Sequence, residues 1–389
     1  MTETINTEAL APNISLGIIA WNEADSIGAC LESVFRQSLF SKLSDRKLTC
    51  EIICLANGCT DDTSNVAQKS FDAHASVHPF KNSFTCRLIN LAERGKLNAW
   101  NVFVHKLSAP KAQFLCLMDA DILIHHPDTL WNMLAVLLQH PQAVIAVDRP
   151  LKDISFKAHP SVLERISLAT SAMTQARTAQ VTGQLYFIRA TAARNIYLPR
   201  DLAACEDGFI KTVICTDFLT RPASPARIMQ ADDASHVFEA YSSIGDILKN
   251  QKRQMIGQTI VHVLVDKYVK GMNLSQRTHF GEITGDSERT DPTWLKRLIH
   301  EHIRMTHHCW QLFPGILRSR FRPLARMRGI RRALYLPVAI IGFFVTLISC
   351  WRAFRALKQG CTAYWPDTKS LHLAQHLSPT VPPPTVLPT

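Results

Sequence analysis

Two aspartates, Asp119 and Asp121, follow an apolar run at residues 114–118 with one alanine between them. The run is typical of a buried strand, so both carboxylates are expected at the edge of a hydrophobic sheet. A carboxylate there is costly to desolvate unless a cation, a hydrogen-bond donor or water meets it. Mg²⁺ and Mn²⁺ suit the pair, because they bind few carboxylates and complete their shells with phosphate oxygens and water. The pair predicts a divalent metal site, although so short a motif also occurs in solvated loops.

Two other turns present groups that suit a phosphate or a polar ring. Asn57 and Gly58 end a second apolar run and precede a helix start, where backbone N–H groups point outward. Arg94 and Lys96 flank a glycine at another predicted helix start, and their charges would neutralise a diphosphate. Each turn alone also fits an ordinary connection between a strand and a helix.

A further pair of acids is suited to proton transfer. Glu206 and Asp207 are adjacent at a predicted helix start after an apolar strand, and either carboxylate is a candidate general base. Acids in a first turn also complement the helix dipole, which is the simpler interpretation. Downstream, the basic stretch 251–258 contains Arg253 and suits a phosphate.

The elements that must position these groups alternate along the chain. Apolar runs typical of buried strands occupy 14–21, 50–57, 84–91 and 112–121, and helical patterns follow them, three of which lie at 60–68, 95–107 and 127–140. Two more strands are predicted at 143–150 and 181–190, and two more helices at 160–179 and 206–219. This alternation predicts a parallel sheet covered on both faces. Ligands bind at the carboxyl ends of such strands, so Asn57, Asp119 and Asp121 are expected to share one crevice.

Composition indicates a globular protein with some membrane character. Of the 389 residues 47% are apolar and 19% are charged, and the net charge of +11 is unevenly distributed. Seven arginines lie within residues 318–332 with no acid among them, which favours an anionic membrane face or polymer, and no nucleic-acid partner is expected. Eleven cysteines without a CxxC pair indicate reduced thiols and no structural zinc. The N-terminus lacks the basic and apolar regions of a signal peptide.

Residues 333–351 contain no charged side chain and would extend about 28 Å as a helix, close to the hydrocarbon thickness of a bilayer. A buried core helix kinked at Pro337 is one alternative. We favour a membrane segment, because arginines flank both ends and Tyr335 and Trp351 lie near its edges. The arginines before the segment predict a cytosolic N-terminal side, whereas an interfacial or re-entrant helix would leave both ends cytosolic.

Six of these stretches occur in the order found in family 2 inverting glycosyltransferases with the GT-A fold, which the chain resembles over residues 13–260. They are IIAWNEADSIGACLESVFRQ, LANGCTDDT, RGKLNAWN, MDADILIHHPDTL, EDGFIKTVI and QKRQMIGQ. The first has Ala20 and Trp21 where the family more often has Pro and Tyr. The last has Gln254 at the family's Trp position, which speaks against processive polymer synthesis.

The resemblance implies a hexosyltransferase that moves a sugar from a nucleotide-sugar, with a UDP-sugar expected, to a hydroxyl acceptor that is a lipid-linked or envelope glycan. It implies that Asp119 and Asp121 bind Mg²⁺ or Mn²⁺ at the donor diphosphate, and that Asp207 deprotonates the acceptor, with Glu206 as the fallback. Asn57 takes the place of the family's base-reading acid, and its amide can still accept from a uracil N3–H. The donor would be held by Asn22, Glu23, Asn57, Asp61, Lys96, Asp119 and Arg253.

The expected domain plan combines both sets of observations. The predicted segments are a tail at 1–12, a GT-A domain at 13–240, a helical basic region at 241–332, the membrane or interfacial helix at 333–351, and a tail at 352–389 that ends proline-rich. Such an enzyme would serve polysaccharide or glycolipid biosynthesis at the inner membrane of a bacterial-type cell, single-pass or peripheral, with its catalytic domain in the cytosol.

Two other functional classes fit parts of the sequence. A nucleotidyltransferase acting on sugar phosphates shares an acidic metal site on an α/β sheet, but it usually has a glycine-rich basic loop after its first strand. This chain has the acidic WNEADSIG there. A non-catalytic membrane scaffold is the other alternative, and it would be free to lose Asp121 or Asp207, both of which are present.

Overall fold

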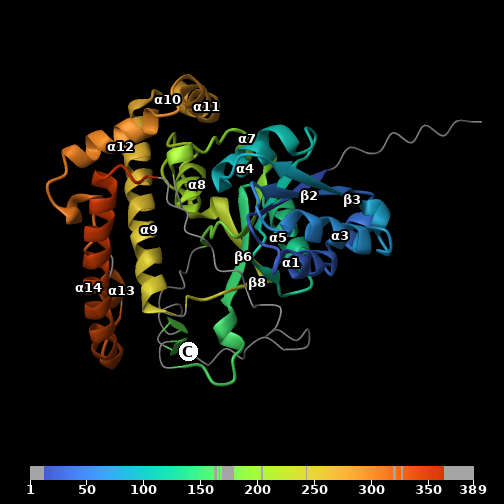
Figure 1. Cartoon of the computed structure of the whole chain (residues 1–389), viewed down its shortest axis with the longest axis horizontal. Coiled ribbons are helices and arrows are strands. Elements are labelled where there is room, and N and C mark those ends of the chain that lie inside the picture. The colour runs from blue at the N-terminus through green and yellow to red at the C-terminus, as the bar shows by residue number, and fades with distance from the viewer. Residues whose placement is uncertain are drawn as a thin grey trace, which may run out of the picture.

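Eight strands in the described part of the chain form one mixed sheet, in the order β3-β2-β1-β4-β7-β6-β8-β5. The computed structural model describes residues 13–161, 164–165, 167–168, 179–202, 205–241, 243–318, 321–325 and 327–362. Helices cover the sheet, and a group of C-terminal helices stands beside it (Figure 1). The α/β class is therefore the one expected, while the predicted tail 1–12, most of the predicted helix 160–179 and the proline-rich end lie outside the described residues.

The first four long strands follow the prediction closely. They pair in parallel and are β1 (Ile14–Ala20), β2 (Cys50–Asn57), β3 (Phe84–Leu91) and β4 (Phe114–Asp119). The carboxyl ends of parallel strands meet at one edge of a sheet. Asn57 and Asp119 therefore lie at the same edge, as expected.

Beyond β4 the expectation of a parallel sheet is wrong. The strand β7 (Leu185–Arg189) lies antiparallel between β4 and β6 (Ile145–Lys152), and β8 (Ile228–Phe238) runs parallel to β6. The short β5 (Leu123–Ile124) closes the sheet antiparallel to β8. A parallel β7 would need a crossover to the far edge of the sheet. Instead the chain re-enters at the edge where β6 ends, so β7 runs backwards.

The reversed direction of β7 matters for the site. Its amino end, rather than its carboxyl end, joins the carboxyl ends of β1, β2 and β4. Gln184 consequently lies beside Asp119, whose backbone N–H donates to the Gln184 carbonyl over 2.8 Å. Thr182 and Gly183, which directly precede Gln184, reach the same edge.

Alternating side chains on the strands build a core on each face of the sheet. On β4, Cys116 and Met118 belong to one core, whereas Leu115 and Leu117 belong to the other. Both faces are covered, which explains why the strands read as continuous apolar runs. One core packs against α1 (Ile27–Phe35), α2 (Leu39–Asp45), α3 (Thr63–Ala75) and α5 (Thr129–Gln139). The other packs against α4 (Lys96–Val102), α7 (Ala190–Arg194), α8 (Glu206–Cys215) and α9 (Ile244–Val263).

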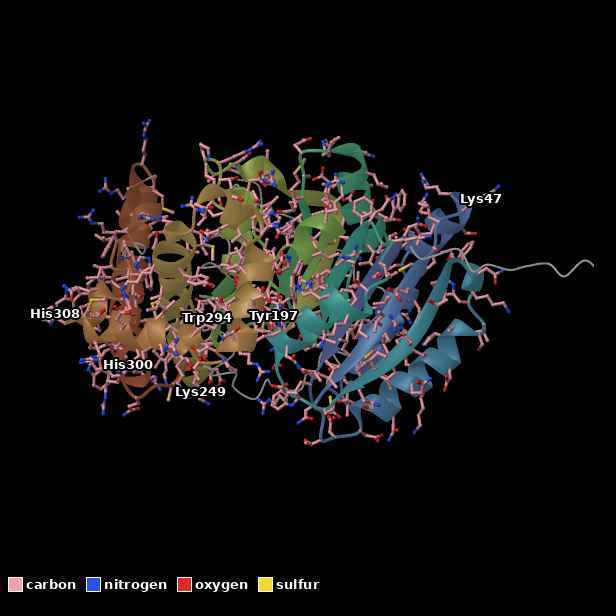
Figure 2. All side chains as sticks on the ribbon, turned by 90° about the horizontal axis from the view of Figure 1, so that it is seen from above. Lys47, Tyr197, Lys249, Trp294, His300 and His308 are labelled. Atoms are coloured by element: carbon pink, nitrogen blue, oxygen red, sulfur yellow. The ribbon has the colours of Figure 1, made fainter. Side chains whose placement is uncertain are left out.

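The C-terminal helices extend the second core away from the sheet. They are α10 (Leu274–Thr278), α11 (Phe280–Thr290), α12 (Trp294–Arg304), α13 (Arg322–Ala325) and α14 (Ile330–Lys358). In Figure 1, α14 runs beside α9 at the margin of the molecule, and the two helices are in contact. Figure 2 shows this end of the molecule marked by His300 and His308, with Lys47 at the opposite end. The helix predicted at 333–351 is thus longer at both ends, and the predicted tail 352–389 begins inside it.

The Asn57–Gly58 turn depends on glycine for a steric reason. Gly58 has φ +66°, and a Cβ there would lie 2.9 Å from the Arg94 backbone nitrogen. We expect Gly58→Ala to lower the free energy of unfolding by about 2 kcal/mol, since a left-handed conformation and a backbone clash both penalise the methyl group. Urea unfolding measures the loss. Gly28→Ala is the matched control, because Gly28 lies inside α1 and a Cβ there would meet only Val66, at 3.7 Å. Equal stabilities of the two variants would contradict the steric role of Gly58.

Candidate active site

Two cavities meet at the carboxyl ends of the strands. The larger has a volume of about 1080 Å³ and lies between the end of β4, the start of α8 and one side of α9. The smaller, of about 70 Å³, is enclosed by Trp21, Glu23, Asn57 and the Arg94–Gly95 turn. Lys96, Asp119 and Asp121 line both cavities. The residues predicted to bind the metal therefore lie between the small cavity and the large one.

Lys96 is the centre of the charge cluster. Its Nζ lies 2.7 Å from each carboxylate oxygen of Asp119 and 3.2 Å from Glu206 Oε1, and it donates to the Gly183 carbonyl over 3.1 Å. Burial alone would lower the pKa of Lys96, but the charges of Asp119 and Glu206 raise it far above its usual value. Lys96 thus stays protonated and joins two acids from β4 and α8.

The two aspartates of the DAD motif differ in their partners. Asp119 is held by Lys96, whereas Asp121 faces both cavities beside it. Burial raises the pKa of Asp119 to about 7 in spite of the Lys96 charge, and burial raises the pKa of Asp121 as well. A bound cation would offset this cost of burying negative charge.

The residues present fit a divalent cation. No three His, Cys, Asp or Glu side chains converge into a ready metal cage within the described ranges. The Lys96 ammonium group bound to Asp119 nevertheless shows that this position accepts a positive charge, and Asp121 adds a carboxylate next to it. Mg²⁺ commonly binds through one or two carboxylates and draws its other ligands from substrate phosphates and water. Asp121, with Asp119, would hold such an ion.

The adjacent acids of α8 have different environments. Glu206 is only 5% exposed and is paired with Lys96. Asp207 lines the large cavity, and its Oδ1 accepts from the Gly208 backbone N–H over 2.7 Å. Burial, and next the charge of Glu206, raise the pKa of Asp207 to about 6. A carboxyl group with a raised pKa in a cavity is suited to take a proton near neutral pH.

Gly183 allows these acids to approach the strand. It has φ +75°, and a Cβ there would lie 3.1 Å from Glu206 Oε1 and 3.5 Å from Asp207 Cβ. The backbone before β7 therefore packs directly against the start of α8. This contact brings Asp207 to the edge that carries Asp121.

The small cavity has a stacked pair at its mouth. The Arg94 guanidinium lies 3.3 Å from the centre of the Trp21 ring. Asn57, which is 2% exposed, accepts from the Gly95 N–H through Oδ1 over 3.1 Å. Asn57 Oδ1, which was expected to accept from a uracil N3–H, thus already accepts one hydrogen bond that holds the Arg94–Gly95 turn.

Two residues predicted to bind the donor lie outside the lining of both cavities. Asn22 Oδ1 accepts from the Thr60 backbone N–H over 2.8 Å. Asp61 accepts from the Ala24 N–H through Oδ2 and from the Thr63 N–H through Oδ1, each over 3.1 Å. Both side chains tie the turn after β1 to the turn after β2. Glu23, Lys96, Asp119 and Arg253 do line a cavity.

The position of Asp61 leads to a test of its role. Burial would raise the pKa of Asp61, but hydrogen bonds from Thr63 and Ala24 outweigh it and lower the pKa. We expect Asp61→Ala to reduce the free energy of unfolding by about 1 kcal/mol near pH 7, because the Ala24 and Thr63 N–H groups lose their acceptor. A depressed folded-state pKa stabilises the fold above the unfolded pKa, so the difference from wild type should shrink as the pH falls below about 4.

Thermal unfolding at several pH values measures this stability difference. Donor KM should change little in Asp61→Ala, whereas Asn57→Ala should raise it. A large rise in donor KM with unchanged stability in Asp61→Ala would restore a direct role in donor binding.

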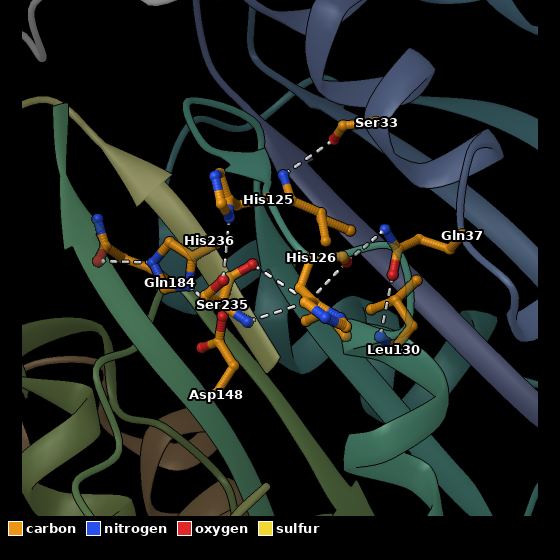
Figure 3. Close-up of polar contacts among 11 residues, drawn as sticks. Ser33, Gln37, His125, His126, Leu130, Asp148, Gln184, Ser235 and His236 are labelled. Atoms are coloured by element: carbon orange, nitrogen blue, oxygen red, sulfur yellow. Dashed lines mark hydrogen bonds and ion pairs between the residues drawn. The ribbon is translucent and has the colours of Figure 1, made fainter. Parts of the chain in front are cut away.

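Asp148, His236 and Gln184 form a buried polar chain that was not predicted from the sequence (Figure 3). His236 Nδ1 lies 2.7 Å from Asp148 Oδ2, and His236 Nε2 lies 3.2 Å from Gln184 Oε1. His236 and Asp148 are 0% and 2% exposed. No strand was predicted at residues 228–238, because apolar and polar residues do not alternate regularly there. Gln184 lines the large cavity, so this chain connects the interior of the sheet to the site.

Two polar atoms in the large cavity lack partners within the described ranges. They are Thr182 Oγ1 and Asn250 Oδ1, which are buried and form no hydrogen bond. Buried polar atoms are rarely left unpaired in native proteins. A ligand with hydroxyl or amide groups would satisfy both atoms.

Comparison with known families gives one match. Residues 15–192 match the family described as glycosyl transferase family 2. The matched segment contains β1 to β7 apart from Ile14, both aspartates of the DAD motif and Lys96. No curated protein matches the chain.

Solved structures with a related arrangement are distant. Staphylococcus aureus TarS 1–349 is 14% identical, with a TM-score of 0.42 over 90% of this chain and 92% of that chain. Glucosyl-3-phosphoglycerate synthase from Mycobacterium tuberculosis, in complex with Mn²⁺, UDP-glucose and phosphoglyceric acid, is 16% identical, with a TM-score of 0.40 over 61% of this chain and 74% of that chain. At this distance the likenesses bear on neither donor nor acceptor of this chain.

Proposed function

Starting from the membership of residues 15–192 in glycosyl transferase family 2, we propose that this glycosyltransferase moves a sugar from a UDP-sugar to a hydroxyl acceptor with inversion at the anomeric carbon. The observation that carries the proposal is the meeting of Asp121, the Lys96–Asp119 pair and Asp207 in one cavity. The proposed cation ligand and the proposed proton acceptor thus line one space that is open to substrate.

The proposed chemistry assigns one role to each group. Asp207 takes the proton of the acceptor hydroxyl, whose oxygen forms a bond to the anomeric carbon while the bond to the diphosphate oxygen breaks. When bound at Asp121, a Mg²⁺ or Mn²⁺ ion would supply positive charge to the departing diphosphate. Lys96 orients Asp119 and pairs with Glu206, and Arg253 adds a positive charge on the α9 side of the cavity.

The acceptor is the less defined partner, and we propose a lipid-linked or envelope glycan. The large cavity continues from Asn250 on α9 to Asp266 on the helical turn Leu264–Tyr268 that follows it, and reaches Phe313 and Pro314. Sixteen residues of helix span roughly 24 Å, more than one sugar ring needs. A location at the cytosolic face of a bacterial-type inner membrane agrees with an apolar C-terminal helix and its arginine-rich flank.

The deciding experiment is a donor panel with purified full-length protein, Mn²⁺ and a membrane acceptor extract. We expect UDP release from one UDP-sugar, stimulated by the extract and abolished by EDTA. Release of pyrophosphate from a nucleoside triphosphate with a sugar phosphate would instead establish a nucleotidyltransferase. No turnover of any nucleotide-sugar, with or without extract, would leave the scaffold as the better interpretation.

A further inference from the structure

One face of α14 is apolar and exposed to solvent. Half of the large apolar side chains exposed in the described residues, eight of sixteen, belong to this helix. Leu334, Ile341, Phe344, Ile348 and Trp351 recur at spacings of seven, three, four and three residues, so they share one face. Ile341 is 65% exposed and Phe344 is 57% exposed. We call these five residues the α14 stripe.

The opposite face of α14 is part of the folded domain. Cys350, Ala353 and Leu357 are buried, and the Cys350 sulfur lies 3.8 Å from the Met255 sulfur of α9. The helix also contacts α12 and α13. Only 24% of the apolar span is buried, which distinguishes α14 from the core helix of a soluble protein.

This half-buried packing is incompatible with a helix that crosses a bilayer alone. Crossing would carry α9 and α12 into the hydrocarbon together with α14. These helices bear Lys249, Arg253 and Arg297, and charged side chains within the hydrocarbon are costly. A helix that lies in the membrane plane keeps its packed face on the protein and needs no such transfer.

The sequence that contains the α14 stripe is strongly basic, which indicates what kind of surface the stripe would bind. Residues 302–366 contain eleven Lys and Arg and no Asp or Glu, as many positive charges as the net charge of the whole chain. Arg328 and Arg332 are exposed at one end of α14, and Arg355 and Lys358 are exposed at the other. An apolar stripe with a tryptophan and cations at both ends matches the boundary between acyl chains and anionic headgroups.

We propose that the α14 stripe is a docking surface for an anionic phospholipid leaflet, in which α14 lies parallel to the membrane and remains packed on α9. The docking surface deepens the membrane location proposed above, and it is measured without sugar transfer, so failure of either proposal leaves the other distinguishable. Because α14 packs on α9, which lines the large cavity, docking would hold that cavity at the membrane surface.

Vesicle flotation of the full-length protein tests the docking surface. We expect binding to vesicles of phosphatidylcholine with phosphatidylglycerol, and Ile341→Asp with Ile348→Asp should weaken it by at least about tenfold, since two apolar side chains leave the acyl region. Leu138→Asp with Leu274→Asp is the matched control, because both leucines are exposed on other helices, at 47% and 61%. Equal thermal unfolding of both double variants would establish that the loss is not misfolding.

Charge is tested separately by neutralising Arg332 and Arg355 with glutamine. Affinity for the anionic vesicles should fall by about fivefold for each charge removed. The proposal would be overturned if the wild-type protein does not bind anionic vesicles, or if the variant of Ile341 and Ile348 binds them as tightly as the wild type. A stripe variant that changes from dimer to monomer without vesicles would assign the stripe to a second copy of the chain instead.

The orientation of α14 is tested in cells. A reporter fused after Thr389 should report the cytosol, and carbonate should release the protein from membranes. A reporter on the outer side, together with resistance to carbonate, would establish a spanning helix and overturn the in-plane arrangement.

Discussion

Asp207→Asn is expected to reduce kcat by about 10³-fold with little change in donor KM, because the amide cannot take the proton of the acceptor hydroxyl. Asp207 lies in the large cavity and is the acid of the α8 pair that does not bind Lys96. Steady-state kinetics with saturating acceptor measures the loss. Binding of UDP, measured by calorimetry, should be retained.

The raised pKa of Asp207 adds a pH dependence to this prediction. With a pKa of about 6, the carboxylate form needed for proton transfer is lost as the pH falls through 6. Wild-type kcat/KM should therefore fall about tenfold per pH unit below that value and level off above it. Glu206→Gln is the informative companion, since it removes a partner of Lys96 and should chiefly alter stability. A loss confined to KM in Asp207→Asn, or a full loss of kcat in Glu206→Gln alone with an intact fold, would transfer the role to Glu206.

Asp121→Asn is expected to lower kcat/KM by about 10²- to 10³-fold, because a neutral amide is a poor ligand for a hard cation and the departing diphosphate loses stabilisation. The loss should be accompanied by weaker Mn²⁺ binding in the presence of UDP, which electron paramagnetic resonance measures without turnover. Asp246→Asn is a matched control, since Asp246 lines the same cavity from α9.

Metal binding should also respond to pH. Burial raises the pKa of Asp121, so a cation competes with a proton for the carboxylate and Mn²⁺ affinity should weaken as the pH falls. EDTA should inactivate the wild type, and added Mn²⁺ should restore it. Full activity of Asp121→Asn, or of the wild type in EDTA, would contradict the metal role.

Local patterns in the sequence determined much of the catalytic half. Apolar-rich runs bounded by polar residues located β1, β2, β3 and β4 to within about two residues. The buried strands β1, β2 and β4 read as continuous apolar segments, whereas the edge strand β3 is only partly buried. Polar residues at the ends of two of those runs then placed Asn57 and Asp119 at one edge. The local sequence also located the start of α8 and its two acids, because the signals that begin a helix lie within a few residues of its first turn.

Contacts between distant residues decided the rest, and no periodicity encodes them. The direction of β7 depends on where the chain re-enters the sheet, and that direction brings Gly183 against the α8 acids. The pairing of Lys96 with both Asp119 and Glu206 joins three elements, and the burial of the Asp148–His236 pair joins β6 to β8. The sequence marked residues 333–351 as apolar enough to enter a membrane. Only the packing of α14 on α9 separated a buried face from an exposed one, because burial is a property of neighbours rather than of a helix by itself.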